Sequence, residues 1–131
     1  MSGTPHIDIM RSPLARARGL GSARLGSHHW IVQRLTAVAL IPLTLWFIYS
    51  VIHMSGASHQ QVIDWMSSPF VLGMLLSLIV ATFHHLASGL QVVIEDYVHQ
   101  EPAKTASLLA MKGACWLLAL ICIVSVLKVG L

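Results

Sequence analysis

Charged side chains are scarce in this chain of 131 residues. Aspartate, glutamate, lysine and arginine together make up only 10% of it, whereas 56% of the residues are hydrophobic. A soluble domain of this size needs a more polar surface than this composition can supply. The scarcity of charge therefore excludes an ordinary soluble domain and indicates a membrane protein.

Cysteine is scarce as well. The two cysteines, Cys115 and Cys122, lie seven residues apart in one apolar segment. On a helix that spacing corresponds to ~10 Å of rise, which is too far for a disulfide between them. We therefore expect both cysteines to be small packing residues.

The first 26 residues lack the apolar core that a secretory signal peptide would need near residue 10. They carry Pro, Gly and four arginines instead: Arg11, Arg16, Arg18 and Arg24. We expect residues 1–27 to be a polar, basic leader that lies on the inner surface of a membrane. Because this leader runs straight into an apolar segment, no nucleic-acid partner is expected for its arginines.

Three long apolar segments follow, at about residues 30–54, 70–95 and 106–129. Each exceeds the ~20 residues that a helix needs to span the hydrocarbon layer. Residues 28–131 are therefore predicted to form an all-α bundle of three transmembrane helices, with no soluble catalytic domain left over. Ser27 is expected to cap the first helix, Pro69 to lie in the first turn of the second, and Pro102 to precede the third.

The basic residues predict the orientation of the bundle. The leader is basic, the first connection (residues 55–68) has no Lys or Arg, and the second (residues 96–105) carries Lys104. The positive-inside rule then places the N-terminus and the second connection in the cytoplasm. Lys128 lies on the opposite side, but one residue does not overturn the pattern.

An ionisable side chain, His85, lies deep in the second apolar segment. Such a residue is expensive in a bilayer and is by default a functional-site hypothesis. It belongs to a row of otherwise small residues that recur every four positions: Gly73, Ser77, Ala81, His85 and Gly89. The row has two interpretations, namely a helix-packing seam with a histidine bonded across it, or room for a flat group that the histidine binds.

The second interpretation suits haem. A neutral imidazole is a good axial ligand for haem iron, and Gly89, one turn from His85, would let a porphyrin lie against the helix. His84 points about 100° away from His85 on a helix, so the two histidines cannot both bind one iron. The second axial position would stay open or be filled by another chain.

The same segment ends in an acidic and aromatic pair, Asp96 and Tyr97. Asp96 lies ~16 Å of helix rise from His85, which places the pair at the cytoplasmic interface. Tyr97 is open to interpretation as an interfacial anchor, and Asp96 as a solvated helix end. Alternatively, the phenol donates a hydrogen bond to a quinone carbonyl while the carboxylate tunes or relays a proton.

Arg34 lies about one turn inside the first apolar segment. One interpretation is that its side chain extends to the lipid phosphates. The other is that it pairs with an anionic group of a cofactor inside the bundle, such as the propionates of a haem held at His85. The expected vertical offset between Arg34 and His85 is ~10 Å.

These residues together resemble a known family. The run from His85 through Gly89 to Val92-Val93-Ile94-Glu95-Asp96-Tyr97-Val98-His99, with the upstream His28-x5-Arg34-x-Thr36-Ala37, resembles the hydrophobic membrane anchor subunit of succinate dehydrogenase, the D-type anchor of respiratory complex II. The resemblance covers residues from about 21 to the C-terminus. The histidine eleven residues before the Asp-Tyr pair is its most specific part.

The resemblance implies an assembly in a bacterial inner (cytoplasmic) membrane. Its partners would be a second three-helix cytochrome b anchor subunit, an iron–sulfur subunit and a flavoprotein subunit, and the chain alone would catalyse nothing. The family shares one haem b between the two anchors and passes electrons from succinate to ubiquinone.

Single residues of this chain match family roles. His85 matches the axial ligand of the haem iron, and Tyr97 and Asp96 match the quinone site. Arg34 matches an arginine near the propionates, and His28 a polar position nearby. Some members have a tryptophan at the positions of Ala87 and Gln91, so these two positions receive no role.

Two alternatives stay open. The chain could be the corresponding anchor of a quinol:fumarate reductase, because sequence does not set the direction of catalysis. It could also be a non-redox membrane scaffold or transporter subunit in which His85 relays protons.

Overall fold

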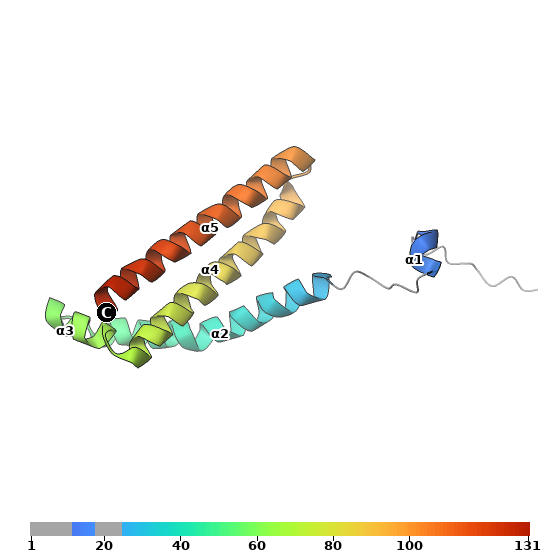
Figure 1. The fold of residues 1–131 in the computed structure, drawn as a ribbon. Coiled ribbons are helices and arrows are strands. Elements are labelled where there is room, and N and C mark those ends of the chain that lie inside the picture. The colour runs from blue at the N-terminus through green and yellow to red at the C-terminus, as the bar shows by residue number, and fades with distance from the viewer. Residues whose placement is uncertain (1–11, 18–24) are drawn as a thin grey trace, which may run out of the picture.

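The computed structural model describes residues 12–17 and 25–131, and these contain five helices (Figure 1). The helices are α1 (Pro13–Ala17), α2 (Leu25–His53), α3 (His59–Met66), α4 (Pro69–Tyr97) and α5 (Glu101–Gly130). Three of them, α2, α4 and α5, are long and apolar enough to cross a membrane. The predicted all-α fold with three membrane spans is therefore confirmed.

Most of the expected basic leader lies outside the described residues, including Arg11, Arg18 and Arg24. Its cytoplasmic placement stays a prediction, and so does the orientation of the bundle. Within the described part, the short helix α1 falls inside the range assigned to the leader.

Several helix ends differ from those expected. α2 begins at Leu25, so Ser27 lies inside the first turn, and the prediction that Ser27 caps this helix is wrong. Pro69 does open α4, as predicted. Pro102 is the second residue of α5 and does not precede it. A proline costs little there because the first-turn N–H groups have no partner within the helix. The second connection consequently shortens to residues 98–100.

The first connection contains a helix, α3, where a loop was expected. Its N-terminus is closed by a capping box: the Ser58 N–H donates to Gln61 Oε1 at 2.8 Å, and the Gln61 N–H donates to Ser58 Oγ at 3.4 Å. Such reciprocal bonds satisfy two backbone donors that a helix start leaves free. The ring of Trp65 on α3 stacks on that of Trp46 on α2, with centroids 6.1 Å apart. The capping box stabilises the start of α3, and the stack holds α3 against α2.

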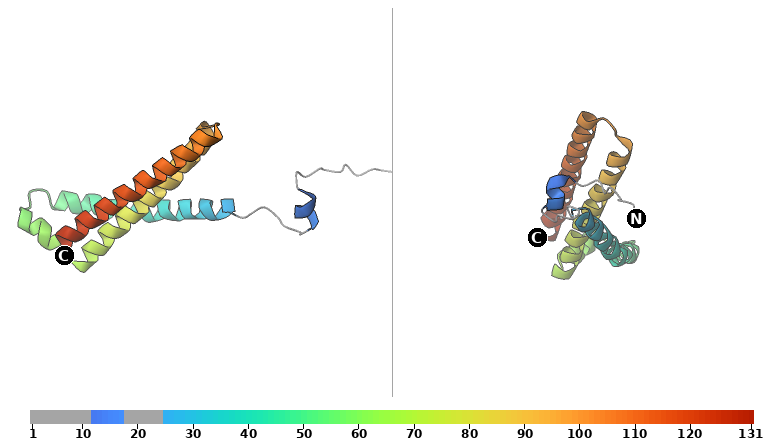
Figure 2. Two further views of the ribbon diagram at one scale, coloured as in Figure 1. Left: turned by 45° about the horizontal axis from the view of Figure 1, so that its top comes forward. Right: turned by 90° about the vertical axis from the view of Figure 1, so that its right-hand side faces the viewer.

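The helix α4 is the central element of the bundle. It runs antiparallel to α5 as a hairpin and also packs against α2, which crosses it at an angle (Figures 1 and 2). Among the described helices, the backbones of α2 and α5 do not approach each other. The structure thus leaves a wedge between α2 and α5, with α4 at its base.

The interior of this chain is small. Among the described residues, the buried apolar ones are Val71, Leu75, Cys115 and Ala119, and many large apolar side chains are exposed. This pattern is expected for helices whose surroundings are lipid or partner helices. Cys115 is buried, Cys122 is half-buried, and neither forms a disulfide, which confirms the expectation that they are not joined.

Candidate functional site

His85 is bonded across the seam between α4 and α2. Its Nδ1 lies 3.1 Å from Thr36 Oγ1. Both residues lie roughly 17 Å of helix rise from the same end of the antiparallel pair, which is the end where α2 starts and α4 stops. The deep position predicted for His85 is therefore matched by a polar partner at the same depth.

The row of small residues lets α2 approach α4 closely at this level. A Cβ atom built on Gly89 would lie 3.6 Å from Nε2 of Gln33 on α2. The side chain of Gln33 thus packs over Gly89 in this structure, so that α2 occupies the surface of α4 at Gly89. The role of Gly89 toward a porphyrin stays a prediction.

Two polar atoms on α2 are buried without a hydrogen-bond partner among the described residues: His29 Nε2 and Gln33 Oε1. Together with Thr36 they occupy positions i, i+4 and i+7, which form one face of a helix. A buried polar atom without a partner costs about 1–3 kcal/mol, so such atoms call for a partner that the described residues do not supply. This face of α2 therefore has unmet hydrogen-bonding capacity next to His85.

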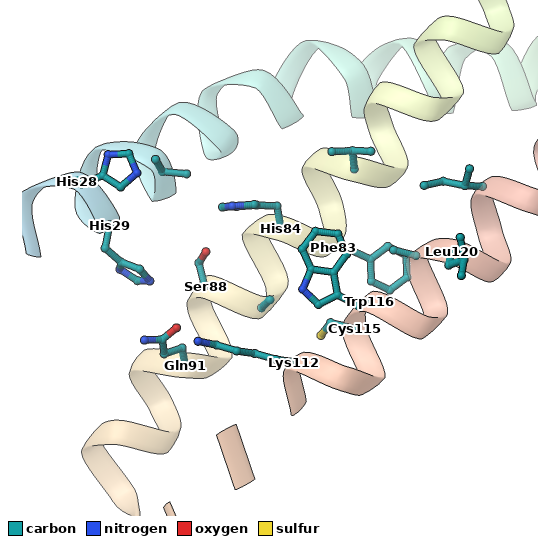
Figure 3. A pocket seen from close by; sticks show the side chains of 15 residues that line it. His28, His29, Phe83, His84, Ser88, Gln91, Lys112, Cys115, Trp116 and Leu120 are labelled. Atoms are coloured by element: carbon teal, nitrogen blue, oxygen red, sulfur yellow. The ribbon is translucent and has the colours of Figure 1, made fainter. Parts of the chain in front are cut away.

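A cavity of about 640 Å³ opens in the wedge between α2, α4 and α5. Figure 3 shows His28 and His29 of α2 at one side of it and Lys112 of α5 extending toward Gln91 and Ser88 of α4. Its lining also includes the apolar side chains of Phe83, Trp116 and Leu120. His84 lines this cavity, whereas His85 does not.

Asp96 and Tyr97 are the last two residues of α4, and both are exposed. The exposed fraction of Tyr97 is 80%, so its phenol is free to meet a molecule outside this chain. The preceding Glu95 accepts a 2.7 Å hydrogen bond from Gln91 one turn earlier. Of the acidic groups at this helix end, Glu95 is engaged within α4, while no described residue bonds the Asp96 side chain.

The structure does not bring Arg34 and His28 to His85. The guanidinium of Arg34 is exposed and lies over the ring of Trp30, 5.4 Å from its centroid. Arg34 is only two residues, or ~3 Å of rise, before Thr36, which bonds His85. The expected vertical offset of ~10 Å from His85 is therefore too large. His28 is exposed and lines the cavity.

Sequence reasoning missed His29, Gln33 and Thr36 as site residues. The signal that could have found them is their shared spacing on α2, with polar side chains on one face of an otherwise apolar helix. Thr36 and His85 are 49 residues apart in sequence, so only the packing of α2 on α4 reveals that they meet.

The side chains available as ligands determine whether this chain could hold a metal ion or a haem. Within the described ranges, no three His, Cys, Asp or Glu side chains gather as a metal site. A bare ion would need such a set. A haem iron receives four nitrogen ligands from its porphyrin, so a protein chain can hold it with a single axial imidazole, and His85 offers one imidazole.

The chain matches one family model over residues 8–126, described as the succinate dehydrogenase/fumarate reductase transmembrane subunit. Similar curated proteins include the succinate dehydrogenase hydrophobic membrane anchor subunit of Rickettsia bellii, which is 33% identical over 78% of this chain and 82% of its own length. The protein of the same name from Paracoccus denitrificans is 32% identical over 72% of this chain and 74% of its own length. No solved structure matches the chain significantly.

Proposed function

This chain belongs to the succinate dehydrogenase/fumarate reductase transmembrane subunit family, and from that premise we propose that it anchors a succinate dehydrogenase in the membrane, co-binds haem b through His85 and forms part of the ubiquinone site. The polar seam at His85 is the observation that carries this proposal. An imidazole at mid-membrane depth is held there by Thr36, beside two buried polar atoms that lack partners.

The seam residues fit a haem in their chemistry. Nε2 of His85 has no hydrogen-bond partner among the described residues and, unlike His29 Nε2, is not a buried orphan atom. It is therefore open to a group that packs on the bundle. When bound, a haem supplies one-electron chemistry. In this proposal His85 binds the iron, His29 and Gln33 offer polar contacts at the seam, and Arg34 offers charge for the propionates.

The C-terminal end of α4 is suited to a quinone site. Tyr97 is exposed at the end of a membrane helix, where an amphipathic, lipid-soluble ring can reach it. The phenol O–H donates to a quinone carbonyl, and Asp96 holds a carboxylate beside it that accepts or passes on a proton. The chain has no further catalytic part of its own in this proposal, so succinate oxidation belongs to its partners.

The partners proposed are a second three-helix cytochrome b anchor, an iron–sulfur subunit and a flavoprotein subunit. The largely outward-facing apolar surface and the unmet polar atoms on α2 support a neighbouring anchor helix. We place the assembly in a bacterial inner membrane with the N-terminus in the cytoplasm, on the strength of the arginines and Lys104.

The deciding experiment is affinity purification of the assembly from membranes through a tag on this chain. We expect co-purification of three further subunits, a b-type band in the reduced-minus-oxidised spectrum, and succinate-driven reduction of ubiquinone. An assembly without a b-type band would favour the non-redox scaffold. A preference for a low-potential quinol and fumarate would favour the fumarate reductase.

A further inference from the structure

The hydroxyl of Thr36 has three possible partners and one hydrogen. Its Oγ1 lies 2.9 Å from the carbonyl oxygen of Val32, 3.0 Å from that of Gln33 and 3.1 Å from His85 Nδ1. Both carbonyls belong to the turn of α2 that precedes Thr36. A threonine inside a helix commonly donates to just such a carbonyl.

Carbonyl oxygens can only accept hydrogen bonds. If the single hydroxyl hydrogen points at them, the oxygen presents a lone pair to the imidazole, and Nδ1 of His85 must then carry the proton. The opposite tautomer would put a hydrogen on Nε2, for which the described residues offer no acceptor. In an apolar layer such an unpaired N–H is costly.

We infer that Thr36 is a positioning residue that fixes His85 in the Nδ1–H tautomer, so that the Nε2 lone pair is held ready for the haem iron. This inference rests on the proposed function and deepens it, because it names the group that orients the ligand. Histidine ligands commonly donate their second ring N–H to an acceptor, which fixes the ring and raises the basicity of the ligand. Here the acceptor comes from a different helix, so ligand orientation depends on the packing of α2 against α4.

The test uses the tagged assembly, purified with its partners, carrying Thr36→Val. Valine has the shape of threonine and no acceptor. We expect haem retention in a competition with apomyoglobin to fall roughly 10-fold, as for other losses of an orienting acceptor. We also expect the midpoint potential of the haem to rise, because a less basic ligand stabilises the ferric form less. Thr36→Ser keeps the acceptor and should restore both values.

The control is Thr44→Val, the same change at an exposed position on the same helix, which should leave haem retention and potential at wild-type values. If Thr36→Val impairs assembly, Thr36→Ser and Thr36→Cys form a size-matched pair that differs in acceptor strength. Equal potentials and haem retention in that pair, or a wild-type result for Thr36→Val, would overturn the inference. Either of these two outcomes would overturn the role of Thr36 and leave the proposed function intact. A wild-type assembly that contains no haem would overturn both the role of Thr36 and the proposed function.

Discussion

His84 and His85 are adjacent in sequence, but their side chains leave α4 in different directions. His85 is bonded to Thr36 on α2, whereas His84 lines the cavity in the wedge between α2 and α5. The helical rotation of about 100° per residue therefore gives two neighbouring imidazoles different surroundings. This difference makes the pair a matched test of the proposed haem ligand.

His85→Ala should remove the imidazole that we propose as this chain's haem ligand. If His85 binds the iron as proposed, we expect the b-type spectrum of the purified assembly to be reduced or altered, since one of the proposed axial ligands would be missing. His84→Ala should keep the wild-type spectrum. The measurement is a reduced-minus-oxidised spectrum with haem quantified per assembly, and a wild-type spectrum for His85→Ala would contradict the assignment.

Tyr97→Phe removes one phenolic O–H from an exposed helix end. We expect succinate–ubiquinone reductase activity to fall roughly 10-fold, as for the loss of a single hydrogen bond of about 1.4 kcal/mol. Succinate oxidation with an artificial acceptor should be unchanged, because that reaction bypasses the quinone. Tyr49→Phe is the matched control, since Tyr49 is also exposed but stacks on His53 near the other end of the bundle.

Asp96→Asn keeps the size of the side chain and removes its charge. If the carboxylate passes a proton at the quinone site, quinone reduction should slow about 10-fold or more, and the artificial-acceptor reaction should be unaffected. The neighbouring Glu95 is bonded to Gln91 within α4, so Glu95→Gln should have a small effect. Equal losses in the two variants would point to general surface charge and away from a role of Asp96.

Gly130→Ala tests how α5 ends against α4. A Cβ on Gly130 would lie 2.8 Å from Leu72 Cδ1 and 3.1 Å from the backbone oxygen of Met66. Because the backbone oxygen has little freedom to yield, we expect a loss of about 1–3 kcal/mol, measured as a lower midpoint of thermal unfolding in detergent. Gly113→Ala meets no atom within 4 Å and should gain about 0.5–1 kcal/mol.

Much of the fold could be predicted because it depends on local properties. The hydropathy of the three segments is sufficient to locate α2, α4 and α5. Pro69 marks the start of α4 because its fixed φ angle and missing N–H suit the first turn of a helix. The depth of His85 also follows from its position within one helix, without knowledge of its neighbours.

The partners of His85 could not be predicted because they depend on how two helices are rotated against each other. Hydropathy leaves that rotation undetermined, so neither the hydrogen bond between Thr36 and His85 nor the contact of Gln33 with Gly89 could be predicted from it. The helix α3 was missed for another reason. Half of its eight residues are polar, and the residues of its capping box, Ser58 and Gln61, also suit a loop.

The wedge between α2 and α5 has a consequence for the stability of this subunit in the cell. Among the described helices, the backbone of α2 approaches only that of α4, and Trp46 of α2 stacks on Trp65 of α3. We therefore expect neighbouring subunits to stabilise the position of α2. Copies made in excess of those subunits would have a weakly packed α2 and two polar atoms without hydrogen-bond partners among the described residues. We expect membrane proteases to degrade such copies. We expect the steady-state abundance of this subunit to follow that of its partners.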